Sequence, residues 1–456
     1  MVTFLLNGEV VNAEVKSSDT LLNFLREVKG LTGTKEGCNE GDCGACSVIV
    51  TDETGIAKTT NSCIALMPQI HGKAVRTVEG ISGPDGSLHP IQKSMVKNHG
   101  SQCGFCTPGF ISTLVAAHKN GDSDIENQLA GNLCRCTGYG PIIHSAKENL
   151  NESVPVWMNE NLDRLKDITS PNNLPQSLED LATLYKNNPE ATLVAGATDL
   201  SLDITKKLKS FKNMIFLGGC EQLKHIEITT ETVQIGAACT IAELIVNLRS
   251  TFPSFTDMLL RYGAVQIRNS ATIGGNIANG SPVGDGPPAL IALGAILKLR
   301  HAETIRMLPI EDFFIDYGVQ DLNPGEFIES IIIPKEVDIL KCYKVSKRFD
   351  QDISAICGCF KLTVFENTIT ECRIAYGGMA GTPKRAFKTE KKLIGSQWSY
   401  KTFETAKSEI SRDFFPISDL RASSNYRLKV AQNLLTRLFY EMTDTNIDSR
   451  GVLPCP

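Results

Sequence analysis

The sequence of 456 residues has no long hydrophobic run and no large excess of one charge. Its longest apolar stretch, residues 289–297, is far shorter than the ~20 residues of a membrane-spanning helix. The N-terminal segment turns polar at Glu9, so no signal peptide is predicted. The net charge of −5 gives no broad basic surface, which argues against nucleic acid and anionic membranes as partners. We therefore expect a cytoplasmic protein.

Several nucleotide- and metal-binding signatures are also missing. The sequence has no G-x-G-x-x-G and no Walker A motif, so Rossmann and P-loop domains are not favoured. Histidine is scarce, with seven residues in all. We interpret those of the first 150 residues as structural or surface groups, because better-spaced cysteines are available as ligands; they are His71, His89, His99, His118 and His144.

Cysteine, by contrast, is abundant. Eight of the fifteen cysteines precede residue 137. A disulfide framework is not expected in a long chain without an export signal, so clustered cysteines indicate metal or redox chemistry. The other cysteines show no ligand spacing, and we interpret them as buried small apolar residues; they are Cys220, Cys239, Cys342, Cys357, Cys359, Cys372 and Cys455.

The first cysteine group has the spacing C-x4-C-x2-C-x16-C, formed by Cys38, Cys43, Cys46 and Cys63. This is the arrangement of a plant-type [2Fe–2S] cluster, in which four thiolates hold two irons. Gly37, Gly41 and Gly44 allow the tight loop and the approach of amides to the sulfurs. A zinc site is the alternative, but zinc ribbons usually pair two C-x2-C knuckles, which this loop does not contain.

The second cysteine group combines two short motifs, formed by Cys103, Cys106, Cys134 and Cys136. Each motif precedes a predicted helix, so two helix N-termini can present four thiolates to one cluster. A C-x2-C pair alone is also typical of a thioredoxin-like redox site, but no βαβ pattern surrounds it. Next to the first group, the combination favours a second [2Fe–2S] cluster.

The pattern of elements divides the chain into segments. Residues 1 to about 80 predict a small sheet with strands at Val2–Leu6, Glu9–Val15 and Ser47–Val50 and a helix at Asp19–Val28, capped by its acidic first residue. Residues 85–150 predict a bundle of four helices, at Pro90–Asn98, Pro108–Lys119, Ile125–Ala130 and Tyr139–Leu150. The polar residues 151–172 are the best candidate for a linker.

Beyond the linker the signals are mixed α and β. The final segment, from about residue 341, predicts strands such as Phe360–Phe365 followed by helices such as Arg427–Tyr440. The charged run 347–352 is typical of a solvated turn. Two small-residue turns, at 193–200 and 271–276, offer hydroxyls and backbone amides to a pyrophosphate. Each alone is more often a plain loop, but together with iron–sulfur motifs they indicate a redox nucleotide such as FAD.

The motifs resemble the molybdenum hydroxylases over essentially the whole chain. GCNEGDCGACSV, SQCGFCTPG and NLCRCTGYGPI are similar to their iron–sulfur half, and LVAGATDL and SATIGGNIANGSPVGD to their FAD-binding domain. The order is that of the xanthine dehydrogenase type, and KRFDQDISA resembles the bacterial form. The resemblance implies a multidomain α+β protein. Its parts are a plant-type ferredoxin-like β-grasp domain (1–80), a helical [2Fe–2S] domain (81–152), a linker (153–172), an FAD-binding domain of the vanillyl-alcohol-oxidase type (173–340) and a C-terminal domain of the CO-dehydrogenase flavoprotein type (341–456).

The resemblance also implies which residues contact the cofactors. The eight motif cysteines ligate the two clusters, the group at Cys103 being nearer molybdenum and the group at Cys38 nearer the flavin. The residues implied for FAD are Leu193, Val194, Ala195, Gly196, Ala197, Thr198, Asp199, Leu200, Thr272, Ile273, Gly274, Gly275, Asn276, Asp285, Tyr262, Ile328 and Lys344. Tyr262 stands where relatives often have Phe, so stacking on the flavin is expected and its hydroxyl is unexplained.

The function implied by the resemblance is electron transfer. The eukaryotic enzymes of this family continue, past the point that matches about residue 456, into a large molybdopterin region. A separate large subunit is therefore expected to carry the molybdenum cofactor, and pairs of heterodimers are expected. Electrons from its purine substrate pass through two clusters to FAD and then to NAD, and this chain has no hydroxylation residues. The alternatives are the same subunit of an aldehyde or N-heterocycle hydroxylase, a stand-alone iron–sulfur flavin NADH reductase, and a zinc-stapled interaction protein.

Overall fold

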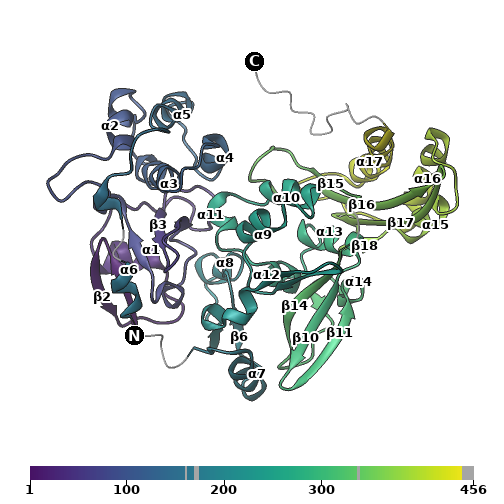
Figure 1. Cartoon of the computed structure of the whole chain (residues 1–456), viewed down its shortest axis with the longest axis horizontal. Coiled ribbons are helices and arrows are strands. Elements are labelled where there is room, and N and C mark those ends of the chain that lie inside the picture. The colour runs from purple at the N-terminus through teal and green to yellow at the C-terminus, as the bar shows by residue number, and fades with distance from the viewer. Residues whose placement is uncertain (160–161, 169–173, 336–338, 444–456) are drawn as a thin grey trace. The chain divides into compact units, whose positions relative to one another are not determined.

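A computed structural model describes residues 1–159, 162–168, 174–335 and 339–443 (Figure 1). The chain forms two compact units, which are described separately. Unit 1 comprises residues 1–221, 240–242 and 263–272, and unit 2 comprises the segments 222–239, 243–262 and 273–456. Within the described ranges, no helix is long and apolar enough to cross a membrane.

Unit 1 begins with a five-stranded sheet in the order β2-β1-β5-β3-β4. The strands are β1 (Val2–Leu6), β2 (Glu9–Ala13), β3 (Ser47–Thr51), β4 (Ala57–Asn61) and β5 (Ala74–Arg76). Asn7 and Gly8 both have positive φ, at 50° and 88°, which is the backbone of a tight hairpin between β1 and β2. The predicted strands are therefore present, and β1 pairs with β5 in parallel.

The predicted helix at Asp19–Val28 is only partly correct. The structure has one α-helical turn, α1 (Leu21–Asn23), followed by a π-helical segment at Phe24–Val28. Its N-cap is Thr20, whose hydroxyl accepts from the amide of Asn23, whereas Asp19 accepts from the amide of Lys16. The acidic cap was predicted wrongly because both residues are good caps and the turn at Lys16 uses the first.

The second part of unit 1 contains the four predicted helices, with ends that differ by one to three residues. They are α2 (Pro90–Lys97), α3 (Thr107–Asn120), α4 (Ile125–Leu129) and α5 (Gly140–Lys147). α3 is buried along most of its length, and its Phe110, Leu114 and Val115 belong to the core of this part. The rings of His89 and His118 are also buried here and meet edge to face at 5.2 Å between their centroids.

The predicted linker is more ordered than its composition indicates. It contains a 3-10 turn at Val156–Met158 and helix α6 (Leu162–Lys166), while residues 160–161 and 169–173 lie outside the described ranges. Met158 is buried, and Trp157 donates a hydrogen bond of 3.1 Å to the carbonyl of Ile81. The two large apolar side chains thus anchor this segment to the helical part.

The remaining elements of unit 1 follow the linker. They are α7 (Leu178–Asn187), β6 (Thr192–Val194), α8 (Leu200–Thr205), β7 (Met214–Phe216) and α11 (Val265–Arg268). β6 and β7 form a short parallel pair, and the turn after β6 begins at Val194, the one buried residue of that strand. Helix α9 (Ile241–Leu248) continues from unit 1 into unit 2.

The described residues of unit 2 form two larger antiparallel sheets and one two-stranded hairpin. The first has the order β11-β10-β14-β9-β8 and comprises β8 (Ile226–Ile228), β9 (Thr232–Gly236), β10 (Ile296–His301), β11 (Thr304–Pro309) and β14 (Phe327–Pro334). Accompanying it are the hairpin β12 (Phe314–Asp316) and β13 (Val319–Gln320) and the helices α10 (Pro253–Leu260), α12 (Ile273–Ala278), α13 (Gly286–Leu293) and α14 (Ile310–Phe313).

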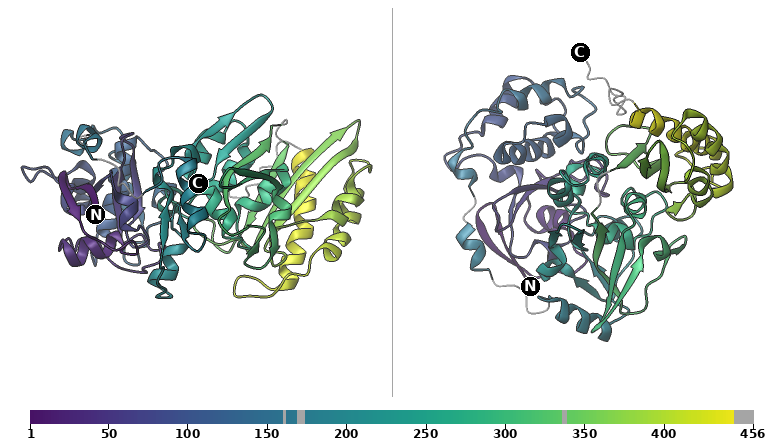
Figure 2. Two further views of the ribbon diagram at one scale, coloured as in Figure 1. Left: turned by 90° about the horizontal axis from the view of Figure 1, so that it is seen from below. Right: turned by 45° about the vertical axis from the view of Figure 1, so that its right-hand side comes forward.

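Three helices that follow the second sheet of unit 2 share its hydrophobic core, and α13 also packs against its strands (Figure 2). The strands of this sheet are β15 (Leu340–Val345), β16 (Ile356–Phe365), β17 (Thr368–Gly377) and β18 (Lys384–Arg385), and the three helices are α15 (Phe387–Leu393), α16 (Tyr400–Asp413) and α17 (Ser424–Thr443). The aromatic core includes Phe360, Tyr376 and Phe403. The predicted strand and helix of this segment lie within β16 and α17.

The charged group most deeply buried here is Arg427 of α17. Its guanidinium donates to the carbonyls of Ala355 and Gly378, at 2.6 and 2.7 Å, and to both carboxylate oxygens of Asp419. Burial raises the pKa of Asp419, but the amides of Ala422 and Arg421 and the Arg427 guanidinium outweigh it and bring that pKa to about 2.

We expect Arg427→Leu to destabilise unit 2 by about 3 kcal/mol or more, because it leaves buried carbonyls and a carboxylate unpaired. Calorimetric unfolding would measure this. The control is Arg421→Leu, whose guanidinium lies 3.6 Å from Asp419 at the surface and should cost less than about 1 kcal/mol. Since the pKa of Asp419 is lowered from 3.8, the wild-type contribution is present above pH 3.8 and is lost as the pH falls toward 2. Equal losses in both variants would contradict the prediction.

Candidate cofactor sites

Three of the four cysteines of the first group lie in the loop between the first helix and β3. Cys46 directly precedes β3, and Cys63 follows β4. The amides of Asp42 and Cys43 both donate to the sulfur of Cys38 at 3.3 Å. Such N–H···S bonds stabilise negative charge on a ligand sulfur. The structure therefore brings the predicted cysteines of this group together.

Hydrogen bonds among these thiols shift their pKa values in opposite directions. Hydrogen bonds from Cys43 and Cys63 lower the pKa of Cys38, and the same bonds raise the pKa values of the two donors. A hydrogen bond from Cys63 likewise lowers the pKa of Cys46. Asn61, which is buried, accepts from Cys46 and donates to the carbonyl of Gly41 at 2.8 Å. All four sulfurs are thus linked in one group.

The second cysteine group joins its two motifs in crosswise pairs. The amide of Phe105, and then a hydrogen bond with Cys136, lower the pKa of Cys103. The same thiol–thiol hydrogen bond raises the pKa of Cys136. Burial and then a hydrogen bond with Cys134 raise the pKa of Cys106 to about 12. The exposed pair is Cys103 and Cys136, and the other pair is more buried.

The loop around Cys134 is held in a strained conformation. Tyr139 has φ of 68°, a left-handed backbone that an aromatic residue rarely adopts. Its hydroxyl accepts from the amide of Cys134 at 3.0 Å, and Thr137 contacts the Cys134 sulfur through both its hydroxyl and its amide. These hydrogen bonds offset the strain and fix Cys134 in the loop before α5.

The donor set of both groups fits a [2Fe–2S] cluster, which takes two thiolates on each of two irons. The sulfurs meet in pairs and receive backbone amides. Gly37 also fits a ligand loop, because a Cβ there would lie 2.7 Å from the sulfur of Cys43.

The predicted FAD residues divide between the two units. In unit 1, Leu193 and Val194 end β6, and residues 195–199 form the turn before α8. Ala197 has φ of 60°, and a Cβ on Gly196 would lie 1.9 Å from the carbonyl of Ser270. Because Ser270 directly precedes Ala271, the structure places the turn after β6 against the start of the second predicted turn, whose residues 271 and 272 belong to unit 1.

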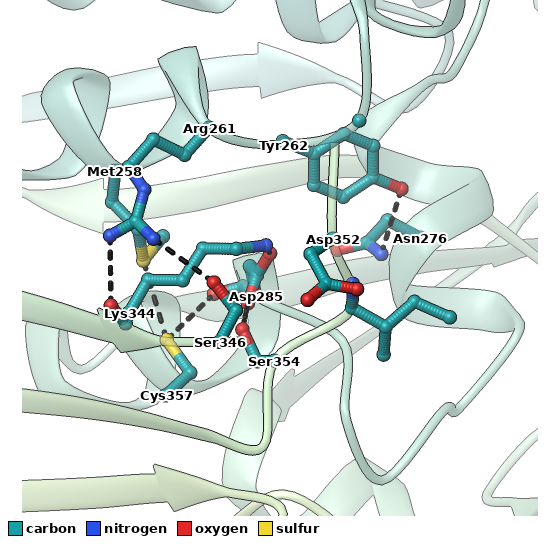
Figure 3. Close-up of polar contacts among 12 residues, drawn as sticks. Met258, Arg261, Tyr262, Asn276, Asp285, Lys344, Ser346, Asp352, Ser354 and Cys357 are labelled. Atoms are coloured by element: carbon teal, nitrogen blue, oxygen red, sulfur yellow. Dashed lines mark hydrogen bonds and ion pairs between the residues drawn. The ribbon is translucent and has the colours of Figure 1, made fainter. Parts of the chain in front are cut away.

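In unit 2, the residues 273–276 begin α12. A Cβ on Gly274 would lie 2.5 Å from the Cβ of Ala237, so this turn requires glycine for close packing. The amide nitrogen of Asn276 donates to the Tyr262 hydroxyl at 3.2 Å, which gives that hydroxyl a partner (Figure 3). The Asn276 oxygen is buried and accepts no hydrogen bond from the described residues, so an acceptor is available to a ligand.

Asp285 and Lys344 form a buried ion pair at 2.5 Å (Figure 3). The hydroxyl of Ser354, also buried, donates to the other carboxylate oxygen at 2.5 Å. Such a pair is retained where its charges are fully hydrogen-bonded. Ile328, by contrast, lies on β14 opposite Leu299 of β10, and Gly275 belongs to the first turn of α12.

Arg261 holds the segment that connects β15 to β16. Its guanidinium donates to the carbonyls of Lys344 and Phe349 and to the hydroxyl of Ser346, at 2.8, 3.0 and 3.0 Å. It also stacks on the Phe349 ring, 4.3 Å from the centroid. Sequence reasoning interpreted residues 347–352 as a solvated turn. The turn is exposed at 347–350, but it is tied to the neighbourhood of Lys344.

Sequence reasoning did not identify Arg261, Ser354 or Asn61 as site residues. Each acts through a hydrogen bond to a segment distant in the chain. The motif GSPVGD contains Asp285, but its partner Ser354 lies 69 positions later. The adjacency of Arg261 to Tyr262 is the one signal that sequence offered. The later cysteines are placed as predicted where they are described, because five are buried and Cys342 is half-buried. Cys455 lies outside the described residues.

Comparison with known families accounts for most of the chain. Four family models match: a 2Fe-2S iron–sulfur cluster binding domain at 4–68, a [2Fe-2S] binding domain at 77–147, the FAD binding domain in molybdopterin dehydrogenase at 171–336 and the CO dehydrogenase flavoprotein C-terminal domain at 341–442. The chain is built from the iron–sulfur and FAD-binding domains of a molybdenum hydroxylase. These domains bind two [2Fe–2S] clusters and FAD, and the predicted α+β fold class is confirmed.

Relatives of this chain include two xanthine dehydrogenases. That of Dictyostelium discoideum is 31% identical over 90% of this chain and 38% of its own length. The xanthine dehydrogenase/oxidase of Gallus gallus is 31% identical over 89% of this chain and 37% of its length. The chain therefore spans less than two fifths of these relatives. Among solved structures, CO dehydrogenase from Oligotropha carboxidovorans matches with a TM-score of 0.55 and 27% identity, over 58% of this chain and 93% of that one.

We expect Gly37→Ala to reduce the iron content of the purified chain, because the added methyl meets the sulfur of Cys43 at 2.7 Å. Iron analysis and low-temperature EPR should show loss of one of two cluster signals. Gly218→Ala is the control, since no heavy atom lies within 4 Å of its added methyl. Two intact signals in Gly37→Ala would contradict the proposed ligand loop.

We expect Lys344→Met to lower the FAD content and leave the iron content unchanged, because the buried carboxylate of Asp285 loses its counter-charge. Flavin released by acid would be quantified per mole of chain. The same substitution at Lys341, on the same strand but on its other face, is the control. Equal flavin content in the two variants would show that the ion pair does not support FAD.

Proposed function

We propose that this chain is the electron-transfer subunit of a cytoplasmic, NAD-dependent xanthine dehydrogenase. In this proposal a large partner subunit carries the molybdenum cofactor and hydroxylates hypoxanthine or xanthine, and two such heterodimers associate. The bound groups supply one-electron transfer at each [2Fe–2S] cluster and two-electron exchange with NAD at FAD. The chain itself binds and orients these groups.

The ligand assignment is part of the proposal. The cysteines at 38, 43, 46 and 63 hold one cluster, and those at 103, 106, 134 and 136 hold the other. The turn at 193–200, Thr272 and the segment 273–276 hold FAD, with Tyr262, Asp285, Ile328 and Lys344 around it. Domain boundaries near residues 80, 152, 172 and 340 complete the assignment.

The observation that carries the proposal is the presence of all four domains on one chain. The xanthine dehydrogenase of Dictyostelium discoideum aligns with 90% of this chain, whereas the CO dehydrogenase chain aligns with 58%. A chain with two electron-carrying clusters needs a donor at their far end. This supports a partner subunit over a stand-alone NADH reductase. The names of the relatives include both dehydrogenase and oxidase, and we propose NAD as the acceptor.

An anaerobic titration of the purified chain with NADH tests the nicotinamide part of this function. We expect the flavin absorbance and the iron–sulfur absorbance to bleach together, since electrons entering at FAD also reach the clusters. A coloured, FAD-replete protein that NADH leaves unchanged would overturn NAD as the acceptor. A colourless protein after cofactor reconstitution would overturn the redox function and favour a zinc-bound protein.

The substrate is tested with the partner present. The complex of the chain with its molybdenum subunit should reduce NAD with xanthine, and reduction should be slower with an aldehyde or an N-heterocycle in place of xanthine. A complex that reduces NAD only with an aldehyde would replace xanthine as the substrate and would leave the electron-transfer role of this chain intact.

A further inference from the structure

Gln266 is a fully buried polar residue on the short helix α11 of unit 1. Its side-chain nitrogen faces three acceptors: Asn132 Oδ1 at 3.0 Å, Ser47 Oγ at 3.3 Å and Thr113 Oγ1 at 3.5 Å. The acceptors belong to three separate segments, namely the loop before Cys134, β3 and α3. One side chain from the FAD-binding region therefore bridges both cysteine-containing parts.

Asn132 transmits this contact to the first cysteine loop. Its oxygen also accepts from the hydroxyl of Thr113 at 3.0 Å, and its nitrogen donates to the carbonyl of Gly44 at 3.2 Å. Because the oxygen is fixed by two donors, the nitrogen has a defined direction. Gly44 lies between Cys43 and Cys46. The network thus ends within the first ligand loop.

A backbone hydrogen bond connects the two ligand loops at the same place. The amide of Leu133 donates to the carbonyl of Cys43 at 3.0 Å. Leu133 is joined covalently to Cys134, so one hydrogen bond and a few covalent bonds separate a cysteine of one group from a cysteine of the other. Asn132, the residue before Leu133, is the one that Gln266 holds.

One polar atom of the Gln266 side chain is left without a hydrogen bond from the described residues. Its side-chain oxygen is buried and accepts no hydrogen bond from the described residues. A Cβ on Gly131 would lie 2.0 Å from that oxygen, so Gly131 must lack a side chain. An apolar residue would avoid the cost of an unpaired acceptor. What Gln266 adds over an apolar residue is the direction of its amide toward Asn132.

We infer that Gln266 is a positioning residue for electron transfer between the two clusters. It fixes Asn132 and thereby keeps the Leu133 amide on the Cys43 carbonyl, and this hydrogen bond is the route between the two ligand sets. The transfer moves one electron, oxidising one cluster and reducing the other, and no bond forms or breaks. The inference rests on the proposed function, since it requires both clusters.

The test uses Gln266→Leu in the full chain with both clusters and FAD. Leucine fills a similar volume without donating to Asn132. The matched control is Asn120→Leu. Asn120 ties α3 to the first domain through two hydrogen bonds with Ala57, but it lies at the opposite end of the helix from Cys106, about 20 Å away at 1.5 Å per residue. Thr113→Val removes one donor to Asn132 and is the milder second variant.

Two readouts separate positioning from stability. The first is the magnetic interaction between the two reduced clusters in EPR. The second is the rate at which an electron introduced by pulse radiolysis equilibrates between them. We expect Gln266→Leu to slow equilibration severalfold and to change the magnetic interaction, and Thr113→Val to do so to a smaller degree. Asn120→Leu should lower the unfolding temperature while leaving both readouts at wild-type values.

The outcomes distinguish the inference from the proposed function. Wild-type protein lacking two reducible clusters would overturn the proposed function and this inference with it. Two normal wild-type signals that stay unchanged in Gln266→Leu would overturn the inference alone. Equal changes in Gln266→Leu and Asn120→Leu would also overturn it, because they would show a general loss of packing. If Gln266→Leu does not fold, an unchanged rate in Thr113→Val overturns the inference.

Discussion

Unit 1 depends on the close approach of backbone to backbone at Gly44. A Cβ on Gly44, whose φ is 69°, would lie 2.2 Å from the carbonyl of Gly131. A Cβ on Gly109 of α3 would lie 2.2 Å from the carbonyl of Gly44. No side chain other than hydrogen fits at either contact. The first cysteine loop is therefore packed directly against the helix and the loop that carry the second cysteine group.

This contact explains why polar residues surround it. Three chain segments meet here through their backbones, and buried carbonyls need donors. Asn132 supplies one to Gly44, and Leu133 supplies one to Cys43. The same rule holds for a buried charge in unit 2, because the carboxylate of Asp285 accepts hydrogen bonds from a lysine and a serine. In both units these buried polar atoms are held by partners from distant segments.

The sequence predicted the parts that local pattern determines. Cysteine spacing predicted two groups whose members the structure brings together, and capping and periodicity located α2 to α5, because a helix N-terminus and a short loop are set by residues a few positions apart. The order of the linker segment was underestimated, because Trp157 and Met158 pack on residues that lie far away in the sequence. Gln266 was missed for the same reason: its three partners lie 134, 153 and 219 positions away.

The domain cores and the domain junctions differ in the kind of interaction they use. The cores are apolar, as at Phe110 and Leu114 in the helical part and Phe360 in the last domain. Apolar burial stabilises a domain but is non-directional, so it tolerates small shifts between surfaces. Glycine contacts and amide hydrogen bonds are directional and tolerate little displacement. Their concentration at the junction of the two cysteine groups indicates that relative position, more than stability, is what this junction secures.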